Sequence, residues 1–121
     1  MQKHSKSYPK RGEIFIADLD PGFGREMRKK RPILVISNNT LNKNSNTLIM
    51  VPFSSIVPEF MGPNIVDIEN EGLDKRSAII VDQIRSVDKG RLINKVGNLT
   101  SYKLFEVEDA LKIVLGLESL V

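Results

Sequence analysis

Short apolar segments separated by polar, turn-forming residues run through most of this chain. The clearest case is residues 32–37, a short, apolar and β-branched run of the kind that forms a buried strand more often than a short helix. We predict strands over residues 13–18, 32–37, 47–53, 64–68, 77–81 and 92–96. Several short strands with frequent turns favour a small antiparallel barrel over alternating strand–helix units.

Two polar stretches interrupt this pattern and are predicted to be loops. Residues 20–24 read Asp-Pro-Gly-Phe-Gly, which is rich in turn formers, and they lead into a basic run that ends at Arg31. Residues 38–46 form the second polar stretch. The sequence therefore predicts a long basic loop after the first strand and another loop after the second.

The C-terminal residues follow a helical rhythm instead. Apolar side chains recur at intervals of three and four residues, and charged side chains lie on the other side. The apolar set is Leu104, Val107, Ala110, Leu111, Val114 and Leu115, and the charged set is Glu106, Glu108 and Lys112. This is the pattern of an amphipathic helix, with Thr100 or Ser101 as a suitable N-cap. We expect its apolar stripe to cover the barrel core rather than to form a dimer seam, so the predicted fold is mainly β with a C-terminal helix.

At 121 residues the chain is long enough for one domain. We expect a flexible basic tail over residues 1–10, since nothing in it is suited to burial, and a single domain over residues 11–121. With 0 cysteines, disulfides and thiolate metal sites are excluded. The first residues lack the apolar segment of a signal peptide, and no apolar run approaches the roughly 20 residues of a membrane span. We therefore expect a soluble, cytoplasmic protein without a membrane partner.

The net charge of +3 is unevenly distributed. Residues 1–31 hold nine Lys or Arg against four Asp or Glu, a charge of +5, whereas residues 32–121 hold nine against eleven, a charge of −2. Such a concentration suits a polyanionic partner, although a solvated loop explains it equally well. The excess is densest in Arg25, Arg28, Lys29, Lys30 and Arg31.

Candidate catalytic groups are few. The only histidine is His4, within the predicted tail, where no scaffold would orient it as a general base. Asp18 and Asp20 could chelate Mg²⁺ from one face of an extended strand, but Asp20 precedes a proline and is better explained as a turn residue. Three further acidic residues fall in a predicted surface loop: Glu69, Glu71 and Asp74. We expect no metal site and no cofactor.

Arg31 stands where the basic loop meets a buried strand, immediately before Pro32. Proline restrains the preceding residue to an extended conformation, so the guanidinium could be held rigidly and offer parallel donors to a phosphate. Ser54 follows the strand over residues 47–53. If these strands are neighbours, Arg31 and Ser54 approach one point from opposite strand ends, although an arginine and a serine at strand ends are also commonplace.

Several segments, in order, resemble the MazF/PemK/Kid family of toxin endoribonucleases. The most specific reads Arg-Pro-Ile-Leu-Val-Ile-Ser-Asn over residues 31–38, similar to the family's RPVLVI-x-N segment. Residues 11–19 look like its first strand, and residues 51–55 (Val-Pro-Phe-Ser-Ser) look like the strand end that carries its catalytic Ser or Thr. Residues 82–92 (DQIRSVDKGRL) are similar to its EQIRTIDKxRL segment. The last helix matches in length and pattern.

The resemblance implies an SH3-like barrel of the CcdB/MazF superfamily that acts as a homodimer. It also implies cleavage of single-stranded RNA, usually mRNA, at a short recognition sequence, and neutralisation by the acidic tail of a cognate MazE-like antitoxin. Arg31 and Ser54 match the family's essential Arg and Ser/Thr. Residues implied to bind RNA lie in the covering loop and in a segment that touches the RNA: Phe23, Arg25, Glu26, Arg28 and Gln83.

The covering loop departs from the family's usual GxEQxGxRP pattern, because Met27 and Lys29 stand in place of Gln and Gly. We expect this stiffer, more basic loop to alter the recognition sequence and not the class of cleavage.

Without a metal or an anchored histidine, the expected route is attack of the RNA 2′-hydroxyl on the adjacent phosphorus. This step leaves a 2′,3′-cyclic phosphate and a 5′-hydroxyl, and Arg31 would stabilise the charge that grows on the phosphate oxygens. Two other functions stay open. One is a CcdB-like gyrase poison, although that activity depends on a C-terminal Trp-Gly-Ile and this chain ends Glu-Ser-Leu-Val. The other is an RNA-binding barrel that does not cleave.

Overall fold

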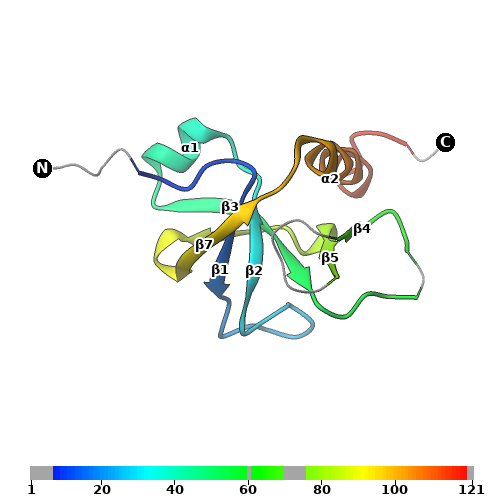
Figure 1. The fold of residues 1–121 in the computed structure, drawn as a ribbon, viewed down its shortest axis with the longest axis horizontal. Coiled ribbons are helices and arrows are strands. Elements are labelled where there is room, and N and C mark those ends of the chain that lie inside the picture. Colours follow the sequence, from blue (N-terminus) through cyan, green and yellow to red (C-terminus); the bar gives the residue numbers. More distant parts are fainter. Residues whose placement is uncertain (1–6, 60, 70–75, 120–121) are drawn as a thin grey trace, which may run out of the picture.

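The computed structural model describes residues 7–59, 61–69 and 76–119, which form strands with a helix against one side (Figure 1). The strands are β1 (Glu13–Asp18), β2 (Lys30–Val35), β3 (Thr47–Ser54), β4 (Ile65–Ile68), β5 (Ser77–Ile80), β6 (Arg85–Asp88) and β7 (Leu92–Asn98). The helices are α1 (Asn39–Asn44) and α2 (Ser101–Val114), and the single 3₁₀ turns η2 (Val81–Gln83) and η3 (Lys89–Arg91) flank β6. All six predicted strands are present, with ends that differ by a few residues.

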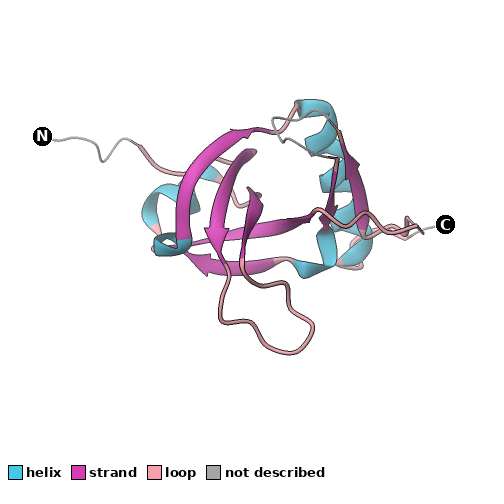
Figure 2. Ribbon diagram, turned by 60° about the horizontal axis from the view of Figure 1, so that its bottom comes forward, coloured by secondary structure: helices cyan, strands magenta, loops and turns pink. Residues whose placement is uncertain are grey.

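The strands form one antiparallel sheet in the order β4-β5-β3-β2-β1-β7, and β6 pairs with β3 beside this path. β3 lies at the centre: β2 occupies one edge, while β6 and then β5 share the other. The sheet curls round on itself (Figure 2). Within the described residues no ladder joins β4 to β7, so the predicted barrel is correct in its strands and curvature but is not closed by hydrogen bonds.

β2 is buried on both faces, which explains its unbroken apolar sequence. Leu34 points into a core that α2 covers, whereas Ile33 and Val35 point into a second core on the opposite face. β3 alternates in the same way between the two cores. The first core includes Ile14, Leu34, Val51, Phe53, Ile68 and Ile79, and the second includes Ala17, Leu19, Ile33, Val35, Leu48 and Met50.

Helix α2 begins at the predicted cap, because the Thr100 side chain accepts a hydrogen bond from the Lys103 amide at 3.3 Å. Val107 and Ala110 are buried in the first core, and Leu104, Leu111 and Val114 pack against it, which confirms the expected core-covering role. Leu115 lies just past the helix and is 52% exposed, so its place in the apolar stripe was wrong. Neither helix of the described residues has the length and apolar character needed to cross a membrane.

The predicted loop over residues 38–46 instead contains helix α1. Asn38 caps it by accepting a hydrogen bond from the Leu41 amide at 2.8 Å. Its one buried side chain is polar: Asn42 donates to the Ser37 carbonyl at 2.9 Å. Strand β6, also absent from the prediction, buries only Val87. Neither element carries the apolar periodicity on which sequence interpretation depends.

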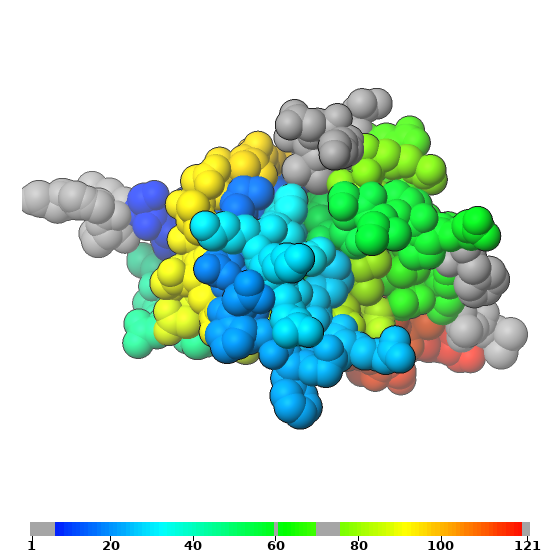
Figure 3. Space-filling model, turned by 90° about the horizontal axis from the view of Figure 1, so that it is seen from below, coloured from blue at the N-terminus to red at the C-terminus, as the bar shows by residue number. Residues whose placement is uncertain are grey.

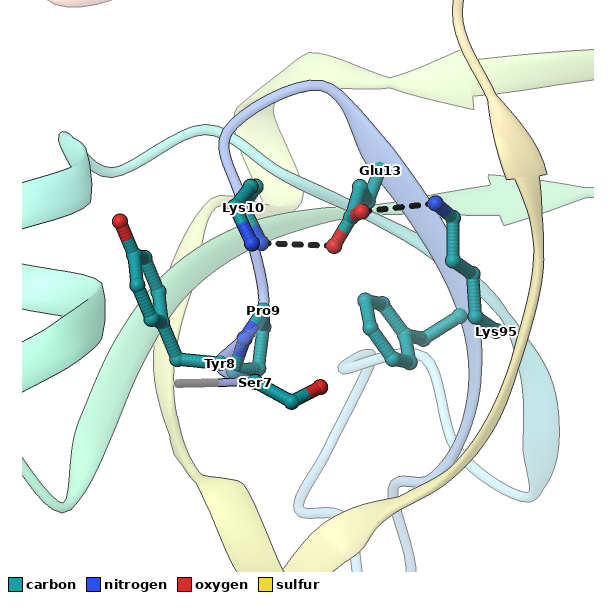
Figure 4. Close-up of a pocket in the computed structure, with 7 residues that line it drawn as sticks. Ser7, Tyr8, Pro9, Lys10, Glu13 and Lys95 are labelled. Atoms are coloured by element: carbon teal, nitrogen blue, oxygen red, sulfur yellow. Dashed lines mark hydrogen bonds and ion pairs between the residues drawn. The ribbon is translucent and has the colours of Figure 1, made fainter. Parts of the chain in front are cut away.

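Residues 7–10 pack more closely than a flexible tail would. Tyr8 and Pro9 are half-buried, and the Lys10 amide donates to Glu13 Oε1 at 2.7 Å. The second Glu13 oxygen accepts a hydrogen bond from Lys95 on β7 at 2.7 Å. Residues 7–10, Glu13 and Lys95 line a cavity of about 320 Å³ beside β1 (Figure 4). His4, with the rest of residues 1–6, lies outside the described residues, as do Glu71 and Asp74.

Candidate active site

Arg31 and Ser54 meet at neighbouring strand ends. The β2–β3 ladder pairs Ile33 with Pro52 and Leu34 with Val51, and the same register continued toward the loop sets Arg31 opposite Ser54. The Arg31 Nη1 donates to the carbonyl oxygen of Phe53, the residue before Ser54, at 3.2 Å. The structure therefore brings together the two residues that the sequence selected.

The Arg31 guanidinium is half-buried and anchored on one side. Its Nε donates to the Arg28 carbonyl at 2.8 Å, in addition to the Nη1 bond. These are the fork's hydrogen bonds to the described residues, and its other N–H groups can donate to a ligand. Burial lowers the pKa of Arg31, and the Asp20 carboxylate opposes this effect. Since an arginine starts from a very high pKa, the group stays a cation at neutral pH.

Ser54 ends β3 and closes the turn that follows. Its Oγ accepts a hydrogen bond from the Ile56 amide and donates to the Ile56 carbonyl, both at 3.1 Å. Its backbone pairs with Ala78 of β5, so the strand end is bordered on the side away from Arg31 as well. The hydroxyl can turn its proton to a phosphate oxygen while it keeps the Ile56 amide as donor.

The loop between β1 and β2 projects from the sheet (Figures 1 and 2). Its two limbs join at the base, where the Lys29 amide donates to Asp20 Oδ1 at 2.9 Å. Asp18 Oδ1 accepts from the Asp20 amide at 3.1 Å, so both carboxylates serve the turn, as the sequence indicated. Arg91 adds a clamp that the sequence did not reveal: its Nη1 donates to the carbonyls of Asp18 and Asp20 at 3.1 and 2.6 Å.

The predicted RNA-binding residues gather on and beside this loop. Phe23 is 84% exposed, and Arg25, Glu26 and Arg28 are exposed as well. Gln83, from η2, reaches the loop by accepting a hydrogen bond from the Met27 amide at 3.3 Å. Figure 3 views the face that carries the loop, coloured blue to cyan, with the residues that follow β3 in green beside it.

The profile of PemK-like, MazF-like toxins of type II toxin–antitoxin systems matches residues 10–115 of the chain. The chain belongs to this family. Among PemK/MazF relatives, the chain is 40% identical to the Endoribonuclease MazF of Staphylococcus epidermidis. The alignment of 112 residues covers 91% of this chain and 93% of that protein.

Solved structures of PemK/MazF proteins share the fold. MazF from Deinococcus radiodurans superposes with a TM-score of 0.80 at 24% identity, covering 91% of this chain and 98% of that one. An endoribonuclease from a mycobacterial species, solved in complex with its cognate antitoxin, gives a TM-score of 0.76 at 24% identity, covering 92% and 98%. These likenesses confirm the predicted fold, mainly β with a C-terminal helix.

Proposed function

We propose that this chain is an endoribonuclease toxin that cleaves single-stranded RNA, mRNA above all, and works as a homodimer in the cytoplasm. The observation that carries the proposal is the hydrogen bond from Arg31 to the Phe53 carbonyl, which holds the guanidinium at the strand end that carries Ser54, beside an exposed basic loop. Membership of the PemK/MazF family and the 40% identity to an endoribonuclease support the same reaction class.

Arg31 stabilises the transition state in this proposal. When the RNA 2′-oxygen attacks the neighbouring phosphorus, the bond to the 5′-oxygen breaks and negative charge grows on the non-bridging oxygens. A guanidinium fixed by the Arg28 and Phe53 carbonyls needs no reorganisation to meet that charge. The 2′-hydroxyl gives up its proton and the leaving 5′-oxygen gains one, so the products are a 2′,3′-cyclic phosphate and a 5′-hydroxyl.

Ser54 binds the same phosphate or holds the 2′-oxygen in line. Its Oγ is fixed by the Ile56 amide, so its position is set by the backbone turn and not by a free rotamer. The loop then lies over the substrate, and its cations neutralise phosphates that flank the cleaved bond. Single strands suit this face because their bases are open to contact, whereas an A-form duplex hides them.

A cognate MazE-like antitoxin would block the same surface. The basic loop is complementary to an acidic segment, which can compete with RNA for Arg25, Arg28 and Arg31. The mycobacterial relative, solved with its own antitoxin, is a precedent for such a complex.

One incubation tests the proposal: the purified protein is mixed with a mixed-sequence single-stranded RNA in EDTA, with Arg31→Ala as the matched control. We expect discrete fragments with cyclic phosphate ends from the wild-type protein alone. Salt-sensitive binding without any product would instead favour the RNA-binding barrel that does not cleave. Activity lost in EDTA and restored by Mg²⁺ would overturn the metal-independent mechanism.

A further inference from the structure

Phe23 is the most exposed large apolar side chain in the described part of the chain, at 84%. It lies at the tip of the loop between β1 and β2, and the neighbouring side chains Arg25 and Arg28 are cationic and exposed. An aromatic ring in this position adds no buried apolar area to either core. Its exposure instead suits a ligand that has an apolar face.

The tip that carries Phe23 is a closed turn. The Phe23 amide donates to Glu26 Oε1 at 2.7 Å, and the Glu26 amide donates back to the Phe23 carbonyl at 3.0 Å. Gly24, between them, has a φ of +60°, a conformation that favours glycine. The Glu26 carboxylate, selected from the sequence as an RNA contact, is therefore engaged within the loop.

The limbs below the tip are also fixed. A Cβ on Gly22 would lie 2.2 Å from Arg28 Cγ, so the Arg28 stem packs against the Gly22 backbone and would have to move to admit a side chain there. The Met27 amide is bound to Gln83, and Arg31 Nε is bound to the Arg28 carbonyl. The loop thus holds the Phe23 ring out in one place and links it to the proposed catalytic arginine.

We propose that Phe23 stacks on a base of the RNA near the cleaved bond, and that Glu26 is a positioning residue that holds Phe23 and does not itself bind RNA. This inference rests on the proposed function and names how the loop engages its substrate. Every base has a π-face, and single-stranded RNA leaves these faces open to aromatic side chains while cations bind the adjacent phosphates. Loss of one such stack weakens binding roughly 5- to 150-fold.

Fluorescence gives a direct test, because the chain contains 0 tryptophans. Phe23→Trp introduces a single indole, and a base stacked on it quenches its emission. The probe is a mixed-sequence 2′-O-methyl RNA, which the 2′-hydroxyl mechanism cannot cleave. The control is Phe105→Trp on α2, 64% exposed and away from the loop (Figure 1). We expect quenching in Phe23→Trp alone; equal quenching in both, or none in either, overturns the proposal.

Affinity separates stacking from charge. Phe23→Ala should weaken binding of the same probe within the stated range and leave the salt dependence unchanged, and Phe23→Tyr should restore binding. Arg25→Ala should instead reduce the slope of log affinity against log salt by about 0.7, the value for one phosphate contact on a single strand. Unchanged affinity in Phe23→Ala would contradict the stacking role. If the wild-type protein cuts no RNA, the proposed function is wrong, whatever affinity is measured with the 2′-O-methyl probe.

Two variants of Glu26 test its positioning role. Glu26→Gln keeps an oxygen that can accept from the Phe23 amide, so it should bind the probe at least as tightly as the wild-type protein. Glu26→Ala removes that acceptor and should weaken binding as Phe23→Ala does, with no further loss in the double variant, because both changes remove one contact. If Glu26→Gln is as damaging as Glu26→Ala, the carboxylate charge itself is required and the positioning role is wrong.

Discussion

Arg31 is tied by hydrogen bond to the backbone of the strand that ends in Ser54. The Nη1 bond to the Phe53 carbonyl, at 3.2 Å, spans the ends of β2 and β3, where the register of the ladder, continued beyond Ile33 and Pro52, sets the two residues opposite each other. Their separation is therefore a property of the sheet. Formation of the β2–β3 ladder is therefore enough to place the Arg31 cation near the Ser54 hydroxyl.

Replacement of Arg31 should remove catalysis and leave the fold intact. Arg31→Ala is expected to lower the cleavage rate by about 10²–10³ or more, because a preorganised donor to the developing charge is lost. Arg31→Lys should stay impaired, since a point charge cannot reproduce the planar fork. Cleavage is followed by gel and folding by circular dichroism, with Arg76→Ala as a control arginine beside β4 and β5. Near wild-type cleavage by Arg31→Ala would remove this residue from the mechanism.

Ser54 should tolerate threonine and not alanine. Ser54→Thr keeps the Oγ that accepts from the Ile56 amide, whereas Ser54→Ala loses that bond and the proposed phosphate contact. We expect Ser54→Thr to cleave within a few-fold of the wild-type rate and Ser54→Ala to fall by about tenfold or more, the effect of one hydrogen bond to a charged group. Ser55→Ala is the neighbouring control. Equal activity in all three variants would assign Ser54 to the turn alone.

The RNA itself should supply the nucleophile. A substrate with a single 2′-deoxy nucleotide on the 5′ side of the cleaved bond is expected to bind with unchanged affinity and to remain uncut. Direct comparison with the all-ribose strand, by filter binding and by gel, checks both halves of this prediction. Any cleavage at the deoxy position would mean that another nucleophile attacks the phosphorus.

Lys29 should be replaceable by glycine with a gain in stability. Its φ is +69°, a left-handed conformation that costs a non-glycine residue about 1–2 kcal/mol. Glycine relieves this strain but loses more freedom on folding, by roughly 0.5–1 kcal/mol, so the net gain lies between zero and about 1.5 kcal/mol. Urea denaturation measures the change. Lys30→Gly, at the first residue of β2, is the control and should be destabilising; the same loss in Lys29→Gly would contradict the strain.

Acid should weaken the fold through Asp67. Two hydrogen bonds from Arg76, at 3.0 and 2.8 Å, hold the pKa of the Asp67 carboxyl below its usual 3.8. A lowered folded-state pKa means that the stabilisation is complete above pH 3.8 and disappears as the pH falls through that value and past the lowered pKa. Unfolding monitored between about pH 5 and pH 2 should have a shallower pH dependence in Asp67→Asn and in Arg76→Gln. A wild-type slope in both would exclude this pair as a contributor.

The sequence predicted the strand ends of the site well, because the physics there is local. An apolar run marks β2 as buried on both faces, and the proline after Arg31 marks the start of that run, although β2 begins two residues earlier, at Lys30. The pairing of β2 with β3 stayed a condition of the sequence interpretation, because α1 lies between the two strands, and the structure supplies it. The rest of the strand order was not predictable from local sequence, because it depends on contacts between residues far apart in the chain. The pairing of both β5 and β6 with one edge of β3 is an example.

The loop's internal contacts were not predictable in the same way. The family resemblance implies that Glu26 binds RNA, and no sequence pattern revealed that its carboxylate accepts a hydrogen bond from the Phe23 amide. The reach of Gln83 to the Met27 amide and of Arg91 to the Asp20 carbonyl joins segments 56 and 71 residues apart. Such bonds between side chains and backbone leave no periodicity, and only the folded arrangement reveals them.

β3 has bonded neighbours along both edges, and it ends in the residue proposed to work with Arg31. The projecting loop, by contrast, is held at its base and by a few side chains. Substitutions in this loop would therefore disturb fewer strand pairings than substitutions in β3. The proposed catalytic pair has less latitude, since any shift of β3 disturbs three ladders at once. In this architecture the segment proposed to select the RNA can vary more freely than the residues proposed to cut it.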